Sequence, residues 1–228
     1  MKVMLLHGFP LDERMWEPQL ETLRDYDVVT PRLYGRGASL DDWAASLLEE
    51  VDGELALVGA SLGGYVALAM TTRTPERVRG LALVGARADA DSPDRRASRA
   101  DTISLIEAGG AEALWENQRP KLLLDAASED AVARARELVL SRRIDELTGA
   151  VRALRDRADS SGTFESFDGP SLVAVGEGDQ FFPPEEAEAL AGRARHGRLR
   201  IFAGARHLPS LEQPDEFNAE LAGFLSDV

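Results

Sequence analysis

One serine in the first third of the chain lies in a turn rich in glycine. Ser61 is the centre of Gly-Ala-Ser-Leu-Gly, residues 59–63, and a further glycine follows. The apolar run 55–58 before it predicts a buried strand, and the apolar run 65–70 after it predicts a buried helix face. Glycines on both sides allow a strand-to-helix turn too tight for side chains, which projects the serine hydroxyl outwards. Ser61 is therefore a candidate nucleophile; the alternative is an ordinary glycine turn in which Ser61 only caps the helix.

A serine hydroxyl is a weak nucleophile at neutral pH and needs a neighbouring base, which an acid must orient. The chain has three histidines, of which His196 lies at a polar helix end and is interpreted as a surface residue. His207 follows the last predicted strand, and Asp179 follows the strand before it. Because active sites collect at the carboxyl edge of a parallel sheet, Ser61, Asp179 and His207 are predicted to form a triad of nucleophile, acid and base. The alternative is that Asp179 only forms a turn and His207 only anchors a loop.

Two backbone N–H groups are candidates for stabilising the negative charge that develops on a carbonyl oxygen under attack. One belongs to Leu62, directly after the serine, and the other belongs to Phe9 in the segment His-Gly-Phe-Pro, residues 7–10. Gly8 allows the backbone to turn towards the site, and the proline after Phe9 has no N–H to donate. His7 also follows a predicted strand, but we interpret it as a residue that shapes this loop rather than as the base.

The composition argues against several classes of protein. The 228 residues include no cysteine, so neither a disulfide framework nor a thiolate metal site can form. The formal net charge of −14 does not favour a nucleic-acid-binding protein, which usually has a basic face. No apolar run approaches the length of a membrane span, and the first residues lack the pattern of a signal peptide. We expect a cytoplasmic protein that binds neither nucleic acid nor membrane and that is a monomer or a homodimer.

The order of strand and helix patterns indicates an α/β protein. Strands that are apolar on both faces, with helices between them, predict a mainly parallel, doubly wound sheet of about six strands. Pro31 lies within one of them, so that strand is expected at the edge of the sheet. The strand patterns lie within the segments 2–8, 27–33, 54–61, 80–86, 170–179 and 198–205.

The segment 87–168 contains no convincing strand and is predicted to be an inserted helical lid, or cap. The α/β core is expected to comprise 1–86 and 169–228, with a last helix from about Pro214. Residues 159–169 are interpreted as a loop that returns to the core. The predicted helices of the insertion cover 98–110, 111–119, 128–143 and 144–158.

Four segments resemble the α/β-hydrolase fold family: LLHGFP, LVGASLGGYVAL, VGEGDQFFPP and AGARHLPSLEQPDEFN. They occur in the family's order and span nearly the whole chain. Within the family the chain is most similar to small bacterial carboxylesterases and to 3-oxoadipate enol-lactonase-like hydrolases. Serine rather than aspartate at position 61 separates it from the dehalogenase and epoxide-hydrolase branches. The chain departs from the family in lacking the two usual first strands, and in having YGRGAS where relatives often have Asp-x-x-Gly-His-Gly.

The resemblance implies a serine hydrolase that cleaves a carboxylic ester or lactone of a small molecule through an acyl-enzyme. It assigns the roles of nucleophile, acid and base to Ser61, Asp179 and His207, and those of oxyanion donors to Phe9 and Leu62. No metal or organic cofactor is required. A carbon–carbon bond hydrolase or a cofactor-free perhydrolase would use the same triad, and a non-catalytic binding protein on this scaffold could keep it as well.

The cap is expected to supply the substrate pocket. Trp115 is its largest apolar residue, and Phe181, Phe182 and Leu208 flank the acid and base loops, so all four are candidates for the pocket wall. Arg87 follows a strand at the same edge of the sheet. If the substrate carries a carboxylate, as enol-lactones of this group do, Arg87 is a candidate to pair with it.

Overall fold

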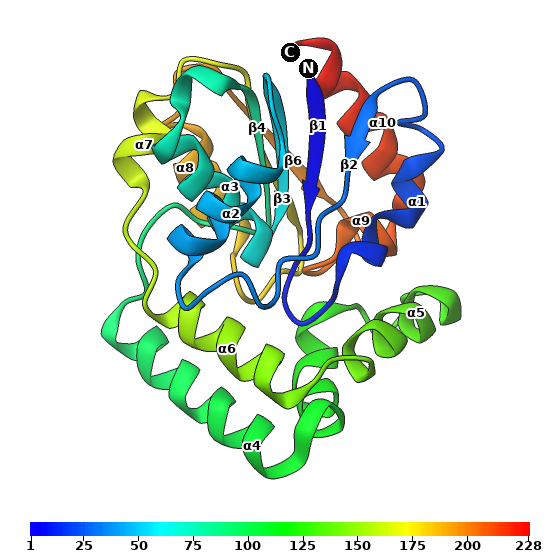
Figure 1. Ribbon diagram of the computed structural model, residues 1–228. Helices are drawn as coiled ribbons and strands as arrows, with labels where there is room; N and C mark the ends of the chain where they lie inside the picture. The colour runs from blue at the N-terminus through cyan, green and yellow to red at the C-terminus, as the bar shows by residue number, and fades with distance from the viewer.

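A parallel sheet of six strands forms the centre of the molecule, and the computed structural model describes all residues, 1–228 (Figure 1). The strands are β1 (Lys2–Leu6), β2 (Asp27–Val29), β3 (Leu55–Ala60), β4 (Val78–Val84), β5 (Ser171–Gly176) and β6 (Gly197–Phe202). Their order in the sheet is β2-β1-β3-β4-β5-β6, and every neighbouring pair is parallel. β3 and β5 are buried along their whole length, because helices cover both faces. The predicted doubly wound α/β fold is confirmed.

The strand at one edge of the sheet ends just before a proline. β2 pairs with β1 through three residues, 27–29, and has no strand on its other side. The edge position predicted from Pro31 is confirmed. The strand is shorter than the predicted 27–33, because a proline has no N–H to donate to the ladder.

Helices pack on the two faces of the sheet and enclose two apolar cores (Figure 1). Leu57 and Val58, which are neighbours in β3, point into opposite cores, as the alternation of side chains along a strand requires. On one side lie α2 (Leu40–Glu50), α3 (Leu62–Arg73), α7 (Ser161–Ser166) and α8 (Pro184–Ala191), and on the other lie α1 (Glu17–Leu20), α9 (Pro209–Glu212) and α10 (Pro214–Ser226). Two short 3-10 helices, η1 (Glu13–Trp16) and η2 (Pro75–Arg77), complete the core.

Three helices between β4 and β5 lie across the carboxyl end of the sheet, below it in Figure 1. They are α4 (Pro93–Leu122), α5 (Glu129–Leu140) and α6 (Ile144–Arg155), and together they are called the cap. α4 unites the helices predicted for 98–110 and 111–119 and breaks between them at Gly110, where φ is 65°. The interpretation of 159–169 as a loop is wrong, because this segment contains α7, which packs against α3. The division of the chain into a core and a cap domain at 87 and 168 stays a prediction.

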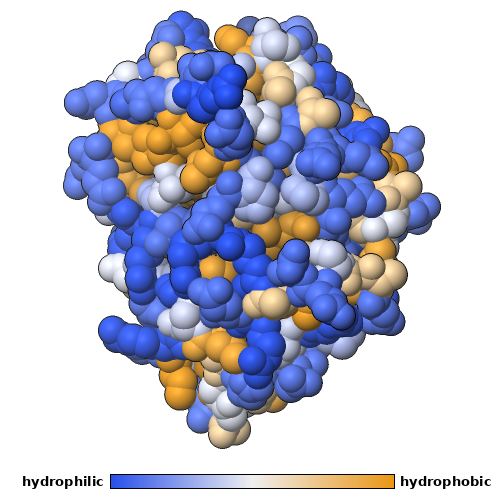
Figure 2. All heavy atoms as spheres, turned by 90° about the vertical axis from the view of Figure 1, so that its right-hand side faces the viewer, coloured by the Kyte–Doolittle hydropathy of each residue, from blue (hydrophilic) through white to orange (hydrophobic).

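The face that carries α1, α5 and α10 is largely hydrophilic, and its hydrophobic side chains form separate patches (Figure 2). The large hydrophobic residues that are exposed on the whole molecule are scattered along the sequence, at Met1, Leu20, Tyr26, Ile144 and Ile201. No helix combines the length with the hydrophobicity that crossing a lipid bilayer requires.

Candidate active site

Ser61 lies in the turn between β3 and α3, at the carboxyl edge of the sheet. It is the only non-glycine residue with a positive φ, 47°, and such backbone conformations cost about 1–3 kcal/mol. A Cβ atom on Gly59 would lie 2.4 Å from the carbonyl oxygen of Gly63, and one on Gly63 would lie 2.1 Å from that of Leu6. The two glycines are therefore required by the close packing of β1, β3 and α3.

His207 and Asp179 form a buried, hydrogen-bonded pair in the loops after β6 and β5. Nδ1 of His207 lies 2.7 Å from Oδ2 of Asp179, and the two side chains are 3% and 0% exposed. Oδ1 of Asp179 accepts the backbone N–H groups of Phe181 and Phe182 at 2.8 and 3.0 Å. The ring of Phe181 packs on the imidazole, with centroids 4.7 Å apart. These contacts fix the carboxylate, and they leave Nε2 as the imidazole nitrogen that is available for chemistry.

Gly85, which the sequence motifs do not mark, connects the serine turn to the histidine. The N–H of Ser61 donates to the carbonyl oxygen of Val84 at 2.8 Å, and Gly85 follows with a φ of 60°. A Cβ atom on Gly85 would lie 2.9 Å from Cε1 of His207 and 3.2 Å from Oδ2 of Asp179. Ser61 and His207 also line the same cavity. The structure thus places Ser61 and His207 on one cavity, with Asp179 paired to His207.

The loop after β1 lies against the serine turn. A Cβ atom on Gly8 would lie 3.6 Å from Cβ of Ser61. The backbone N–H of Phe9 donates to no acceptor within the protein, and Phe9 lines the cavity. Leu62 is the first residue of α3, where backbone N–H groups have no acceptor within the helix. Both predicted oxyanion donors therefore lie beside the serine turn and are free of competing acceptors.

His7 is buried beneath this loop and holds the segment that follows β2. Its Nε2 accepts the backbone N–H of Leu33 at 3.1 Å, and its ring lies against that of Tyr34. Burial lowers the pKa of His7 to about 4, because the charged imidazole would lose its hydration. A neutral imidazole that accepts a backbone hydrogen bond agrees with the interpretation of His7 as a residue that shapes the loop. His196 is exposed, as predicted.

A cavity of about 530 Å³ lies between the serine turn and the cap. Of the residues expected to contact substrate, Phe181 and Arg87 line it. Trp115, Phe182 and Leu208 do not: they are at most 4% exposed, and the structure places them in the two apolar cores instead of the cavity wall. A large apolar side chain beside a functional loop is buried wherever a neighbouring element covers it, so its position in the sequence alone does not assign it to a pocket.

Arg87 already forms a hydrogen bond and ion pairs with other residues of the protein. Its Nη1 donates to the carbonyl oxygen of Phe181 at 2.9 Å, and its Nη2 pairs with Glu186. Its Nε lies 3.4 Å from Oδ1 of Asp89, and its guanidinium lies over the ring of Phe182. Burial disfavours the charge, but Glu186 and Asp89 outweigh it and raise the pKa of Arg87. Arg87 therefore braces the acid loop and retains few donors for a substrate carboxylate.

The cap wall of the cavity is a polar face of α4 that the sequence motifs do not mark. Polar residues at helical spacing usually face solvent, so periodicity alone could not assign them to a site. Tyr65, one turn after Ser61 in α3, faces the same cavity. The side chains of the α4 face recur at intervals of three and four residues, at Arg95, Ser98, Arg99, Thr102 and Leu105.

Comparison with known proteins identifies the family to which this site belongs. Residues 3–220 match the model of the alpha/beta hydrolase family. The chain belongs to the α/β-hydrolase family. The match covers the serine turn, the acid and base loops and the cap, so the resemblance inferred from the sequence is confirmed, and the protein is a hydrolase.

Curated relatives of this hydrolase are named as esterases. The pimeloyl-[acyl-carrier protein] methyl ester esterase of Shewanella woodyi is 24% identical over 240 residues, which cover 99% of this chain and 94% of that protein. The enzyme of the same name from Neisseria meningitidis serogroup B is 27% identical over 239 residues, which cover 98% and 92% of the two chains.

Solved structures agree with these relatives. A thermophilic esterase from Thermogutta terrifontis, described with malate bound, is 31% identical to this hydrolase with a TM-score of 0.93, covering 99% of this chain and 89% of that one. An enol-lactonase from Burkholderia xenovorans shares the fold, with a TM-score of 0.86 at 22% identity and coverage of 98% and 90%. The esterase relatives support ester hydrolysis as the activity of this hydrolase.

Proposed function

We propose that this hydrolase cleaves a carboxylic ester or lactone of a small molecule through a covalent acyl-enzyme. Ser61 is the nucleophile, His207 the general base and Asp179 the acid that orients it. The proposal rests on one observation: Ser61, which has a strained backbone conformation, lines the same cavity as His207, and His207 is paired with Asp179. Strain of this kind persists where the surroundings impose it, and it is concentrated at active sites.

In the first half of the reaction, Oγ of Ser61 attacks the carbonyl carbon while Nε2 of His207 takes the hydroxyl proton. The imidazolium that forms is stabilised by the carboxylate of Asp179, 2.7 Å from Nδ1. The alcohol then leaves with the proton from Nε2. Because the backbone N–H groups of Phe181 and Phe182 hold the other carboxylate oxygen, the pair keeps its orientation through both proton transfers.

The negative charge on the carbonyl oxygen is stabilised by the backbone N–H groups of Phe9 and Leu62. Neither donates to an acceptor within the protein, so no existing hydrogen bond must break. The positive end of the α3 dipole points the same way, because Leu62 is the first residue of that helix. Loss of one such donor typically raises the barrier by about 3 kcal/mol.

In the second half, water attacks the acyl-enzyme with His207 again as base, and Ser61 is restored when the acid leaves. Neither half needs a metal or an organic cofactor. The names of the relatives, a methyl ester esterase and an enol-lactonase, agree with an ester or lactone as substrate.

Turnover of p-nitrophenyl esters of graded acyl length tests the proposal, with an enol-lactone and a vinylogous diketone in parallel. We expect the wild type to hydrolyse esters or the lactone and Ser61→Ala to hydrolyse none. Ser104→Ala, which removes an exposed hydroxyl of α4 that does not line the cavity, is the control and should retain turnover. No turnover of any substrate would leave a binding protein, and cleavage of the diketone alone would assign a carbon–carbon bond hydrolase.

A further inference from the structure

The cavity of this acidic protein has a predominantly basic wall. The formal net charge of the chain is −14. Yet of the five side chains in the wall that carry a permanent charge at neutral pH, four are cations. A cleft lined by one sign of charge attracts ligands of the opposite sign. The cations are Arg87, Arg95, Arg99 and Lys121, and the single anion is Asp101.

The cations differ in how many of their hydrogen-bond donors already have an acceptor within the protein. Arg95 pairs with Asp89 at 3.0 Å, and Asp89 also lies near the guanidinium of Arg87. Arg99 uses only its Nε, which lies 3.0 Å from Oδ2 of Asp91. Its Nη1 and Nη2 groups have no acceptor in the protein, and they form the side of the guanidinium that can bind a carboxylate with two parallel hydrogen bonds.

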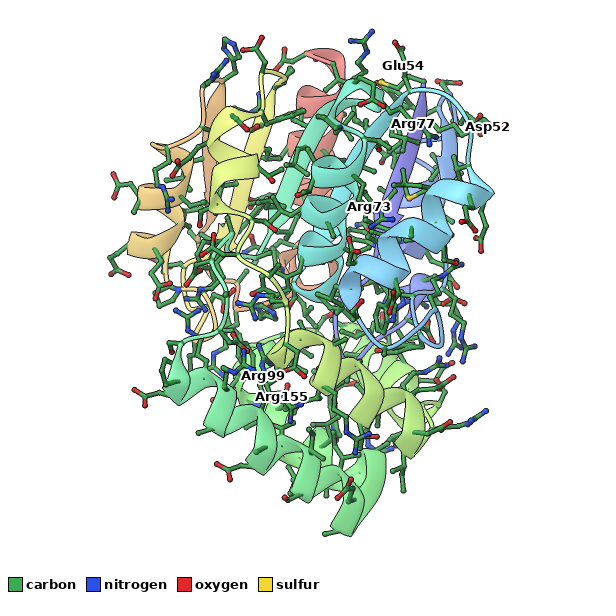
Figure 3. All side chains as sticks on the ribbon, turned by 60° about the vertical axis from the view of Figure 1, so that its left-hand side comes forward. Asp52, Glu54, Arg73, Arg77, Arg99 and Arg155 are labelled. Carbon is green, nitrogen blue, oxygen red and sulfur yellow. The ribbon has the colours of Figure 1, made fainter.

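Arg99 pairs with Asp91, which also forms a buried ion pair with Arg157. Asp91 is 0% exposed, and its Oδ1 accepts Nη1 of Arg157 at 2.6 Å. The guanidinium of Arg157 lies 4.1 Å from the ring of Tyr65, which also borders the cavity. Because Asp91 is shared by two arginines, Arg99 is fixed without being neutralised. Figure 3 shows Arg99 between α4 and the core.

We propose that the substrate is an ester that also carries a carboxylate, and that Arg99 binds this carboxylate. The inference rests on the proposed function, since Ser61 would attack the ester group of the same molecule. The hydroxyl groups of Ser98 and Thr102 lie on the same face of α4 and supply further donors. Asp101 also lines the cavity, but Arg99 forms no ion pair with it: the only carboxylate paired with Arg99 is that of Asp91.

Two pairs of esters of matched shape test this inference, each pair differing in whether a carboxylate replaces a terminal methyl group. Monomethyl glutarate and methyl pentanoate place the difference on the acyl side, whereas 4-acetoxybutanoate and butyl acetate place it on the alcohol side. Hydrolysis is followed by titration of released acid. In at least one pair, we expect a higher kcat/KM for the anionic ester than for its neutral partner.

Arg99→Gln should lower kcat/KM for the preferred anionic ester by about 10- to 100-fold, the range of a lost hydrogen bond to a charged group. The same variant should leave the neutral partner within about twofold, since the neutral ester makes no such bond. Arg96→Gln is the matched control: Arg96 is on α4, half exposed, and pairs with Asp156 away from the cavity wall. It should change neither ester.

A kcat/KM for the anionic ester that exceeds that of its neutral partner in neither pair, or an equal loss for both partners in Arg99→Gln, would overturn the inference. Calorimetric titration with free glutarate separates its failure from that of the proposed function. Glutarate binding that depends on Arg99, in a chain that hydrolyses no ester, would overturn the proposed function but support the carboxylate site. No binding and no hydrolysis would overturn both.

Discussion

Oδ2 of Asp179 lies 2.7 Å from Nδ1 of His207, although the two residues are 28 positions apart in the chain. The sheet produces this contact, because β5 and β6 are parallel neighbours and their following loops leave at the same edge. The other carboxylate oxygen is occupied by two backbone N–H groups, so Asp179 cannot turn away from the imidazole. The carboxylate of Asp179 is therefore the group whose chemistry can be changed, by replacement with an amide, with the least change in the shape of the site.

Asp179→Asn tests this relationship. The amide oxygen can still accept the backbone N–H groups of Phe181 and Phe182, but its NH₂ group would face Nδ1 of His207 and favour the wrong tautomer. We expect kcat to fall by about 10³- to 10⁴-fold with little change in the unfolding midpoint. Glu177→Gln, an exposed change in the same loop, is the control and should keep kcat. Wild-type activity in Asp179→Asn would remove Asp179 from the mechanism.

Gly85→Ala should damage the site through its Cβ atom, which would lie 2.9 Å from Cε1 of His207. Displacement of the imidazole is expected to lower kcat/KM by about 100-fold. Gly53→Ala provides a matched control, because Gly53 has a similar positive φ of 84° but no atom within 4 Å of the added Cβ. Both variants should lose about 1 kcal/mol of stability from backbone strain, and Gly53→Ala alone should retain activity. Equal activities of the two variants would contradict the close approach of Gly85 to His207.

The stability of the protein should depend on pH through His7. Its pKa in the folded protein is about 4, below the ordinary 6.5, so the unfolded chain binds more protons between these values. The stability that His7 contributes is fully present above about pH 6.5 and is lost as the pH falls towards 4, by about 3 kcal/mol in all. Chemical denaturation of wild type and His7→Gln from pH 7.5 to 4 measures this difference. Parallel pH profiles of the two proteins would show that His7 is not the group responsible, and His196→Gln should match the wild type.

Asp91→Asn should destabilise the junction between the core and the cap. The change leaves Arg157, which is 3% exposed, without its carboxylate. Removal of one member of a buried ion pair typically costs about 3–5 kcal/mol. Asp156→Asn is the comparison, because Asp156 pairs with two arginines at the surface and should cost less than about 1 kcal/mol. Urea denaturation of the two variants compares these free energies of unfolding. Similar losses would show that burial of Asp91 does not increase the cost of losing its carboxylate.

The sequence predicts the elements of this fold well because strand and helix patterns depend on local chemistry. Gly59 and Gly63 mark the serine turn, because each is pressed against the backbone of another element. The position of Asp179 and His207 after successive parallel strands was enough to infer that they meet. The return segment was misinterpreted because Gly162 and the serines around it resemble a loop, although Phe164 is buried and α7 forms around it.

The wall of the cavity was harder to predict, because it depends on which face of each helix turns inward. Trp115 and Arg99 both belong to α4, yet Trp115 packs in a core and Arg99 lines the cavity. Local spacing does not distinguish an inward polar face from a solvated one. Gly85 was missed for a similar reason, since its importance comes from His207, which is distant in sequence.

In the proposed reaction, Ser61 forms a covalent bond to the substrate. Incubation of the folded protein with a fluorophosphonate, followed by mass spectrometry of its peptides, tests this most directly. We predict a single adduct on Ser61, no adduct in Ser61→Ala, and much slower labelling in His207→Ala because the base is missing. An adduct on another residue, or no adduct on the folded wild-type protein, would show that Ser61 is not the nucleophile.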